Sequence, residues 1–329
     1  MEKYDFISIG DTVTDAFIKL KDTSAHLDID KGTRELCMGF ADKIPYEDVF
    51  VVPAVGNSAN AAVAAARLGL KSALVSNVGG DYFGDECLEA LRKENVGTNF
   101  VIKNTGRKTN YHYVLWYDDD RTILIKHEEY DYIFPDIDDP AWIYLSSAAE
   151  NSLPFHDVLL GYLEARPNIK LAFQPGTFQM KFGKERLAGL YRRSDVFISN
   201  KEESERILKT EENDIKKLLE MIRALGPKIA VITDGVKGAY ASDGEKALFM
   251  PPYPDPKPPL ERTGAGDAFS STFVAVIALG KSVEDALMRA PVNSMSVVQY
   301  VGAREGLLNM NQIEEFLKNA PHDYKPTSI

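Results

Sequence analysis

The sequence predicts an α/β fold: one domain over residues 1–329, with a mostly parallel sheet, helices on both of its faces, and a small β-sheet as a lid. Three observations predict it. Short apolar runs alternate with helical segments along most of the chain, a pattern typical of parallel sheets. Several of these runs end at Gly, Asp, Asn or Thr, residues that commonly follow strands. Segments 16–54 and 107–126 contain only short strand-like runs instead, and we expect them to form the lid.

The first strand is expected at residues 4–9, an apolar and β-branched run that ends at Gly10 and Asp11. An Ala-rich run predicts the first long helix, which begins at Asn57 and ends near Gly69. The elements expected next are a strand at 73–78, a helix at 85–94, and a hairpin of 110–117 with 121–125 around residues 118–120.

After Pro140 the alternation of strands and helices becomes regular. We expect strands at 142–146, 171–173, 196–199 and 229–233, an antiparallel pair at 238–241 and 247–250, and helices at 154–165, 184–191, 202–208, 215–225, 267–279, 283–300 and 313–318. Ligands of such sheets bind beyond the carboxyl ends of the strands. The residues that directly follow strands are therefore candidates for the site: Asp11, Gly79, Gln174, Asn200 and Thr233.

The chain has 49 acidic and 38 basic residues, which gives a formal net charge of −11. This balance argues against nucleic acid or a membrane surface as a partner, because such proteins usually present a basic face. Only two cysteines, Cys37 and Cys87, are present, too few for a disulfide framework. The N-terminus lacks the pattern of a signal peptide, and no apolar run approaches the ~20 residues that span a bilayer. We therefore expect a cytoplasmic protein.

The strongest chemical signal is the segment 262–269, Arg-Thr-Gly-Ala-Gly-Asp-Ala-Phe, directly before an apolar helix. Glycines allow a tight turn and a close approach to a ligand, and the N–H groups at a helix start bind anions. Asp267 lies at that start, where a carboxylate can take a proton from an attacking hydroxyl while the N–H groups stabilise a transferring phosphoryl group. Taken alone, the composition of this segment favours an ordinary helix cap for Asp267 over a catalytic role.

Two other phosphate-binding motifs are absent. Gly280-Lys281-Ser282 resembles the end of a Walker A loop, but Ala275 stands where the first glycine is required, and the segment follows a helix. No GxGxxG pattern follows a predicted strand, so a dinucleotide fingerprint is missing as well.

An ordered series of short motifs resembles the ribokinase-like (PfkB) family of sugar and nucleoside kinases. The segment ending in Gly264-Ala265-Gly266-Asp267 is similar to the C-terminal signature of that family. The other matching blocks, in family order, are Gly10-Asp11 with Asp15, residues 55–60 continuing to Gly69, residues 78–81 with Gly84, Asn200-Lys201-Glu202-Glu203, Thr233-Asp234-Gly235 with Gly238, and Gly302-Ala303. Each block is weak alone, and the ordered set is specific.

The resemblance implies a ribokinase-like α/β fold with a β lid over the sugar, and ATP-dependent phosphorylation of a hydroxyl with Mg²⁺. It places Asp267 as the catalytic base and Gly264, Ala265 and Gly266 as the anion hole. It places Asp11, Asp15, Gly56, Asn57 and Asn60 on the substrate. It places Asn200, Thr233, Gly235, Gly238, Gly264 and Asn293 on the nucleotide. Glu203 would organise the metal through water, and Glu261 with Thr263 would offer a K⁺ site.

The chain departs from the family pattern at four positions. Val55 replaces the first Gly of the N-terminal pair, Glu261 replaces an Asp, and Gln174 replaces a more usual Asp or Asn. Asn57 lies where some members carry Lys, which favours a neutral polyol or nucleoside over a sugar phosphate.

Several readings stay open from the sequence. Asp11 and Asp15 are also compatible with turn and cap roles, and Asn60, or Asn200 with Glu203, with helix capping. Tyr111, Tyr113 and Trp116 alternate along one strand, and they favour lid packing over a platform for a nucleoside base. The five histidines lack metal-ligand spacing, and we interpret them as surface or hydrogen-bonding residues. The alternatives are a nucleoside-specific kinase or a non-catalytic sensor, and a homodimer through the lid is compatible with the family.

Overall fold

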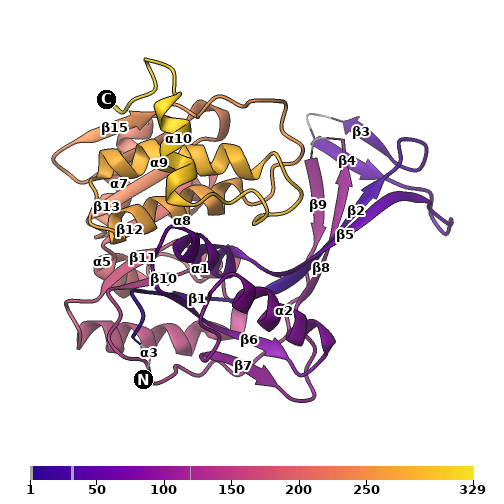
Figure 1. Cartoon of the computed structure of the whole chain (residues 1–329), viewed down its shortest axis with the longest axis horizontal. Coiled ribbons are helices and arrows are strands. Elements are labelled where there is room, and N and C mark those ends of the chain that lie inside the picture. The colour runs from indigo at the N-terminus through magenta and orange to yellow at the C-terminus, as the bar shows by residue number, and fades with distance from the viewer. Residues whose placement is uncertain (1–2, 31–32, 119) are drawn as a thin grey trace.

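A ten-stranded sheet forms the centre of the computed structural model, which describes residues 3–30, 33–118 and 120–329 (Figure 1). In spatial order its strands are β16 (Thr327–Ser328), β15 (Ala247–Met250), β14 (Ala239–Ser242), β13 (Ile229–Thr233), β12 (Val196–Asn200), β11 (Lys170–Phe173), β10 (Trp142–Leu145), β1 (Phe6–Ile9), β6 (Ser72–Gly79) and β7 (Val101–Asn104). The strands from β13 to β7 are parallel, and β14 to β16 are antiparallel. The predicted fold class is confirmed.

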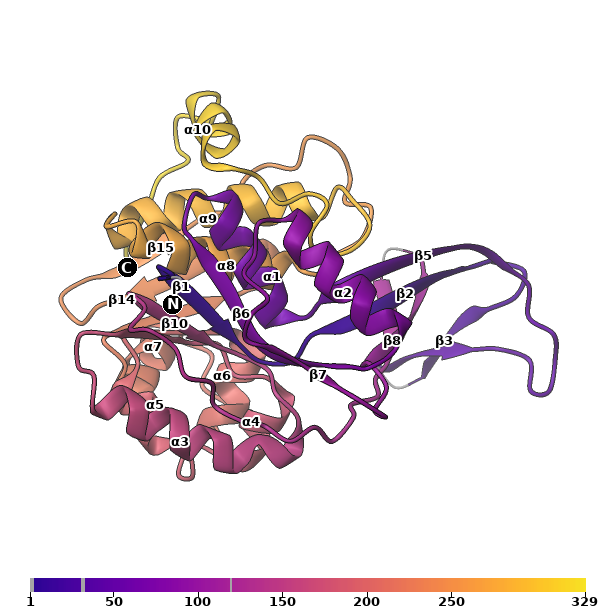
Figure 2. The same ribbon diagram turned by 60° about the horizontal axis from the view of Figure 1, so that its bottom comes forward.

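Helices cover both faces of this sheet because successive strand residues point to opposite sides. In β1, Phe6 packs into one apolar cluster and Ile7 into another, and both are buried. On the face of Phe6 lie α1 (Asn57–Arg67), α2 (Tyr82–Lys93), α8 (Ala265–Ala278), α9 (Val283–Val297) and α10 (Met310–Lys318) (Figure 2). On the other face lie α3 (Leu153–Glu164), α4 (Thr177–Phe182), α5 (Ala188–Arg193), α6 (Lys201–Leu208) and α7 (Ile215–Ala224). Within the described part of the chain, no helix is long and apolar enough to cross a membrane.

A second, four-stranded sheet extends from one end of the central sheet (Figure 1). Its strands, in order, are β5 (Tyr46–Val55), β2 (Val13–Leu20), β8 (Tyr111–Tyr117) and β9 (Asp120–Leu124), and we call it the small sheet. β2 pairs with β8 in parallel, whereas the other two pairings are antiparallel. A separate hairpin of β3 (His26–Asp30) and β4 (Thr33–Cys37) lies beside it. Asp119, which the sequence places in the β8–β9 turn, lies outside the described residues.

The expected elements differ from the structure mainly where they are short. The helix expected at 184–191 begins only at Ala188, and residues 184–187 form turns. Leu187 is as deeply buried as Leu190, so its apolar character could not locate the start of the helix. Several short elements were not predicted, among them β7, α4 and β16, which have four, six and two residues. Such lengths are too short to show a period.

Candidate active site

The loop that was predicted to bind an anion lies at the start of α8. Gly264 is the N-cap residue with φ of 80° and ψ of −2°, a left-handed conformation that favours glycine. A β-carbon at this position would collide with Ala303, so the loop is packed closely against the segment after α9. The first-turn N–H groups of a helix lack partners within the helix and carry its positive end. The start of α8 therefore offers a site for phosphate oxygens.

Asp267 lies in the first turn of α8, partly buried, between two amide side chains. Asn60 on α1 donates through Nδ2 to Oδ2 of Asp267 at 2.9 Å, and Gln174 after β11 donates through Nε2 to Oδ1 at 3.3 Å. Burial raises the pKa of Asp267, while these two hydrogen bonds act in the opposite direction and the charge of Asp15 adds to the rise. A carboxylate with a raised pKa at a helix start is suited to accept a proton.

A polar cavity of about 260 Å³ opens in front of Asp267. Its lining residues come from the central sheet, from α1, from the loop before α8 and from the small sheet: Asn57, Arg121, Gln174, Ser199, Asn200, Glu203, Thr233, Arg262, Thr263, Gly264, Gly266, Asp267 and Ser270. Gln174, Asn200 and Thr233 lie together here because the carboxyl ends of parallel strands meet at one edge of the sheet. Two arginines, Arg121 and Arg262, supply positive charge to this cavity.

Glu203 and Asn200 form a capping box at the start of α6. Asn200 accepts from the N–H of Glu203 at 2.8 Å, and Glu203 accepts from the N–H of Asn200 at 2.9 Å. Burial raises the pKa of Glu203, and the charge of Asp267 raises it further. The capping interpretation and the site interpretation are therefore compatible, because Glu203 caps the helix and also lines the polar cavity.

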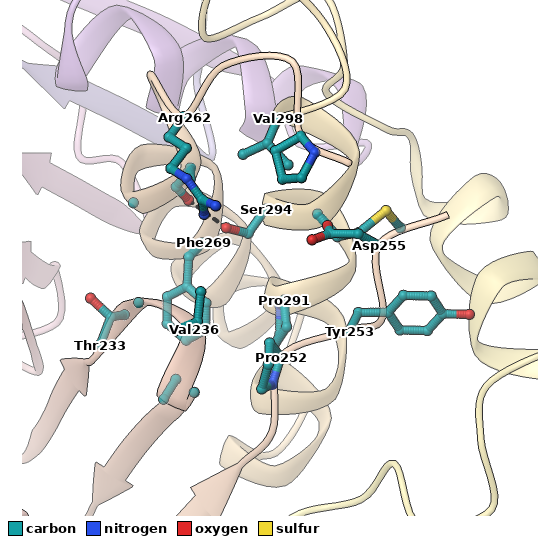
Figure 3. Close-up of a pocket in the computed structure, with 17 residues that line it drawn as sticks. Thr233, Val236, Pro252, Tyr253, Asp255, Arg262, Phe269, Pro291, Ser294 and Val298 are labelled. Atoms are coloured by element: carbon teal, nitrogen blue, oxygen red, sulfur yellow. Dashed lines mark hydrogen bonds between the residues drawn. The ribbon is translucent and has the colours of Figure 1, made fainter. Parts of the chain in front are cut away.

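A second cavity, of about 280 Å³, lies on the other side of the start of α8 (Figure 3). Its walls are mostly apolar, and they include Val236, Pro252, Phe269, Pro291 and Val298. Thr233, Arg262 and Gly266 line both cavities, which are therefore neighbours. Gly235, Gly238 and Ala265 also line this apolar cavity. A ligand with a flat apolar ring fits such a space, and a charged group attached to that ring would reach the polar cavity next to it.

The predicted substrate residues lie on the side of Asp267 that faces the small sheet. Asp11 and Asp15 are buried, with 4% and 8% of their surface exposed. Tyr132 donates its hydroxyl to Oδ1 of Asp11 at 2.6 Å. Gly56 is the N-cap residue of α1 with φ of 107°, and a β-carbon there would press on the carbonyl of Asp11. Asn57 extends this group to the polar cavity.

Two of the predicted site residues, Asn293 and Glu261, are buried and hydrogen-bonded to other parts of the chain. Asn293 is fully buried, donates to the Thr272 hydroxyl at 2.7 Å and accepts from the N–H of Leu308 at 2.8 Å. It joins α8 to the segment after α9, and it is not among the residues that line either cavity. Glu261 is also buried, and its carboxylate accepts from the N–H groups of Thr263 at 2.6 Å and Gly302 at 2.8 Å.

The structure adds four residues that the sequence analysis did not select, namely Arg121, His112, His127 and Tyr132. Gln174, which was selected because it follows a strand, is a hydrogen-bond partner of Asp267. Two of the four added residues could have been found from the alternation of side chains along the predicted hairpin, because His112 and Arg121 point to the same face of the small sheet. His127 and Tyr132 lie in an irregular segment, where no period could have indicated their direction.

A helix start whose first N–H groups lack partners within the helix, a carboxylate beside it and a sheet edge that carries polar residues are the features expected of a phosphotransferase site. A model of the pfkB family of carbohydrate kinases matches residues 29–310, and the chain belongs to this family. Its members are phosphotransferases that act on hydroxyl groups, and this chain is such an enzyme.

Known proteins resemble the chain over most of its length. The chain is 28% identical to the ribokinase of Bacillus subtilis (strain 168) over 276 residues, which cover 80% of this chain and 87% of the relative. The crystal structure of a nucleoside kinase from Methanocaldococcus jannaschii has a TM-score of 0.78 at 18% identity and covers 97% of this chain and 100% of that chain. A ribokinase from Arabidopsis thaliana complexed with ribose and ATP has a TM-score of 0.75 at 19% identity, with coverages of 96% and 99%.

Proposed function

We propose that the chain transfers the γ-phosphoryl group of ATP to a hydroxyl of a small sugar or polyol, and that Asp267 is the base. The observation that carries the proposal is the position of Asp267 between the two sides of the site. It lines the polar cavity at the start of α8, and through Asn60 it touches the acceptor side. The acceptor hydroxyl gives its proton to Asp267, its oxygen bonds to the γ-phosphorus, and the bond to the bridging oxygen of ADP breaks.

The two neighbouring cavities indicate where the parts of the nucleotide would bind. The apolar cavity would hold the adenine base, and the amides of Ala265 and Gly266 after Gly264 would hold the phosphates. The guanidinium of Arg262 lines both cavities and would bind phosphate oxygens between them. In this assignment Asn293 supports α8 from behind and does not touch the nucleotide.

The polar cavity also fits a divalent cation that arrives with the nucleotide. Glu203 and Asp267 direct carboxylates toward one cavity, and a bound Mg²⁺ would offset their charge and polarise the phosphates. The described residues contain no cluster of three or more His, Cys, Asp or Glu that could hold an ion alone. This agrees with Mg²⁺ that keeps waters and binds phosphate oxygens, with Glu203 reaching it through water.

A monovalent cation site is proposed beside the anion loop. Glu261 carries a buried carboxylate, and the hydroxyl of Thr263 is buried without a hydrogen-bond partner among the described residues. K⁺ would offset the charge of Glu261 and fill the coordination of Thr263. Activity in K⁺ buffer compared with a bulky organic cation tests the site, and equal activity in the two would contradict it.

The small sheet is proposed to act as the lid, and its aromatic residues fit packing better than base stacking. Trp116 is buried against Phe50, at 6.4 Å between ring centroids, and its indole N–H donates to the carbonyl of Asp118. Tyr111 packs edge-on against Phe83 on α2 at 4.7 Å, and Tyr111 and Tyr113 point away from the face that carries Asp15. A compact acceptor without a nucleobase suits this arrangement better than a nucleoside does.

The test is an ATP-consumption assay against a panel of sugars, polyols and nucleosides with Mg²⁺. We expect at least one sugar or polyol to stimulate ADP release strongly, because a closed site excludes water and suppresses simple hydrolysis. A non-catalytic sensor would bind a panel member and raise its own melting temperature without turnover. Turnover confined to nucleosides would instead favour the nucleoside-specific kinase.

The outer face of the small sheet is proposed to pack against a second copy of the chain. Val51, Tyr113 and Leu124 are each about half exposed, and they lie with Ala16 in one row across the four strands. An exposed apolar row of this kind is typical of an interface. We expect sedimentation to report a dimer that Val51→Glu converts to a monomer, whereas Val158→Glu, on the exposed face of α3, leaves it intact. A monomeric wild type would contradict the proposal.

A further inference from the structure

Two histidines face the two buried carboxylates on the acceptor side of the site. Nδ1 of His127 lies 3.1 Å from Oδ2 of Asp11, and Nδ1 of His112 lies 3.4 Å from Oδ1 of Asp15. The two imidazole rings are 5.3 Å apart between centroids. The four side chains therefore form one cluster in which each carboxylate has its own imidazole.

The small sheet brings one of these histidines to the site. Asp15 on β2 and His112 on β8 are partners in the parallel ladder, so both point to the same face. His127 comes from the segment after β9 and packs edge-on against Phe178, with ring centroids 5.7 Å apart. Asp11 follows β1 of the central sheet, whereas Asp15 and His112 both belong to the small sheet, which is the proposed lid.

Three buried polar atoms around this cluster have no hydrogen-bond partner among the described residues. They are Nε2 of His112, Oδ1 of Asp15, whose 3.4 Å contact with Nδ1 of His112 is not a hydrogen bond, and Oδ1 of Asn60. Asn60 is 2% exposed, and its Nδ2 already donates to Asp267, the proposed base. Buried polar groups are almost always paired in folded proteins. These three atoms, from β8, β2 and α1, therefore mark positions where a ligand supplies hydroxyl groups.

The charges of the cluster restrict the kind of ligand. Asp11, Asp15 and Asp267 bring three carboxyl groups to this side of the site, and no lysine or arginine of the described residues forms an ion pair with Asp11 or Asp15. The nearby guanidinium groups line the polar cavity for phosphates instead. Imidazole and carboxylate groups match hydroxyls as donors and acceptors, whereas an acidic acceptor would meet charges of its own sign.

We propose that His112 and His127 are acceptor-binding residues, and that with Asp15 and Asp11 they select an uncharged polyhydroxy acceptor over its phosphorylated or acidic forms. The inference rests on the proposed kinase function. His112 and Asp15 are the contacts through which the proposed lid touches the acceptor, and His112 leaves Nε2 for a hydroxyl because its Nδ1 faces Asp15.

Two variants of His112 test the roles of its two ring nitrogens separately. His112→Asn keeps a donor near the place of Nδ1 and removes Nε2, whereas His112→Gln restores a polar atom near the place of Nε2. We expect His112→Asn to raise the KM for the best neutral acceptor about 10- to 100-fold, with an unchanged KM for ATP. His112→Gln is expected to recover part of this loss. His127→Phe, which keeps the ring packing on Phe178, is expected to raise the KM for the acceptor as well.

Two matched controls test whether the effect belongs to the acceptor. His26→Asn changes an exposed histidine of the β3–β4 hairpin and is expected to leave both KM values unchanged. Arg121→Ala removes a guanidinium that the small sheet presents to the polar cavity, and its buried Nε has no partner among the described residues. It is expected to slow turnover while the acceptor still binds in calorimetry without nucleotide.

The outcome separates this inference from the proposed function. If the wild type phosphorylates a neutral sugar and the folded His112 and His127 variants keep its KM, the inference fails and the kinase function stands. Preference for a sugar phosphate or sugar acid over its neutral parent also overturns it. If no acceptor is phosphorylated, the proposed function fails, and a thermal shift by a neutral sugar that His112→Asn abolishes still supports the binding site.

Discussion

Asp267→Asn is expected to lower kcat by about 10²- to 10⁴-fold, the range that a lost general base commonly costs. The amide cannot take the proton of the acceptor hydroxyl, whereas the start of α8 and both cavities keep their shape. The Kd for ATP should therefore change little. Kinetics at saturating substrates together with nucleotide calorimetry check the two halves of this result.

Because the pKa of Asp267 is raised, Asp267→Asn is also expected to change the stability of the protein. Because burial raises the pKa of the carboxyl in the folded state, the folded protein holds its proton to higher pH than the unfolded chain does. Stability therefore falls as pH rises from the unfolded pKa through the folded one, and at neutral pH the buried charge is a cost. Asp267→Asn removes that cost, so we expect a higher melting temperature together with the loss of turnover.

Asp285→Asn is the matched control for Asp267→Asn. Asp285 occupies the corresponding first-turn position of α9, in a capping box with Ser282, and hydrogen bonds lower its pKa against the effect of burial. Its loss should lower stability slightly and leave kcat unchanged. An Asp267→Asn enzyme that kept near wild-type kcat would remove Asp267 from the role of base, whatever its melting temperature.

The sequence could propose those parts of the candidate site that lie within one short segment. The loop before α8 is such a part, because two glycines and a carboxylate beside an apolar helix form a local pattern typical of an anion site. The mostly parallel character of the central sheet was also accessible, since strands and helices alternate within about 30 residues. Asn200 and Thr233 could be selected because each lies at the carboxyl end of a buried strand.

The parts that could not be predicted depend on contacts between distant segments. His112 and Asp15 are 97 positions apart in the chain, and only the parallel pairing of β8 with β2 brings them together. His127 reaches Asp11 from a segment without regular structure, where side-chain direction has no period. Asn293 shows the opposite case, because its motif position suggested the nucleotide while the packing of α9 directs its amide to Thr272.

Gly264→Ala is expected to have the second large effect, and it acts through the backbone. An alanine at φ of 80° costs roughly 1–2 kcal/mol from conformation alone. Its β-carbon would also collide with both the β-carbon and the α-carbon of Ala303, so the loop has to move. Since the amides that follow Gly264 form the proposed anion hole, we expect kcat to fall by about 10²-fold or more, with a lower melting temperature.

Gly280→Ala separates the conformational cost from the loss of the anion hole. Gly280 has φ of 79°, nearly the same as Gly264, but a β-carbon there meets no atom within 4 Å. It should lower stability by about 1 kcal/mol and leave kcat intact. Ala303→Gly should not rescue Gly264→Ala, because the α-carbon of residue 303 is itself in the way. If Gly264→Ala loses only as much activity as Gly280→Ala, then the position of this loop does not control phosphoryl transfer, and the amides of Ala265 and Gly266 are not the anion hole.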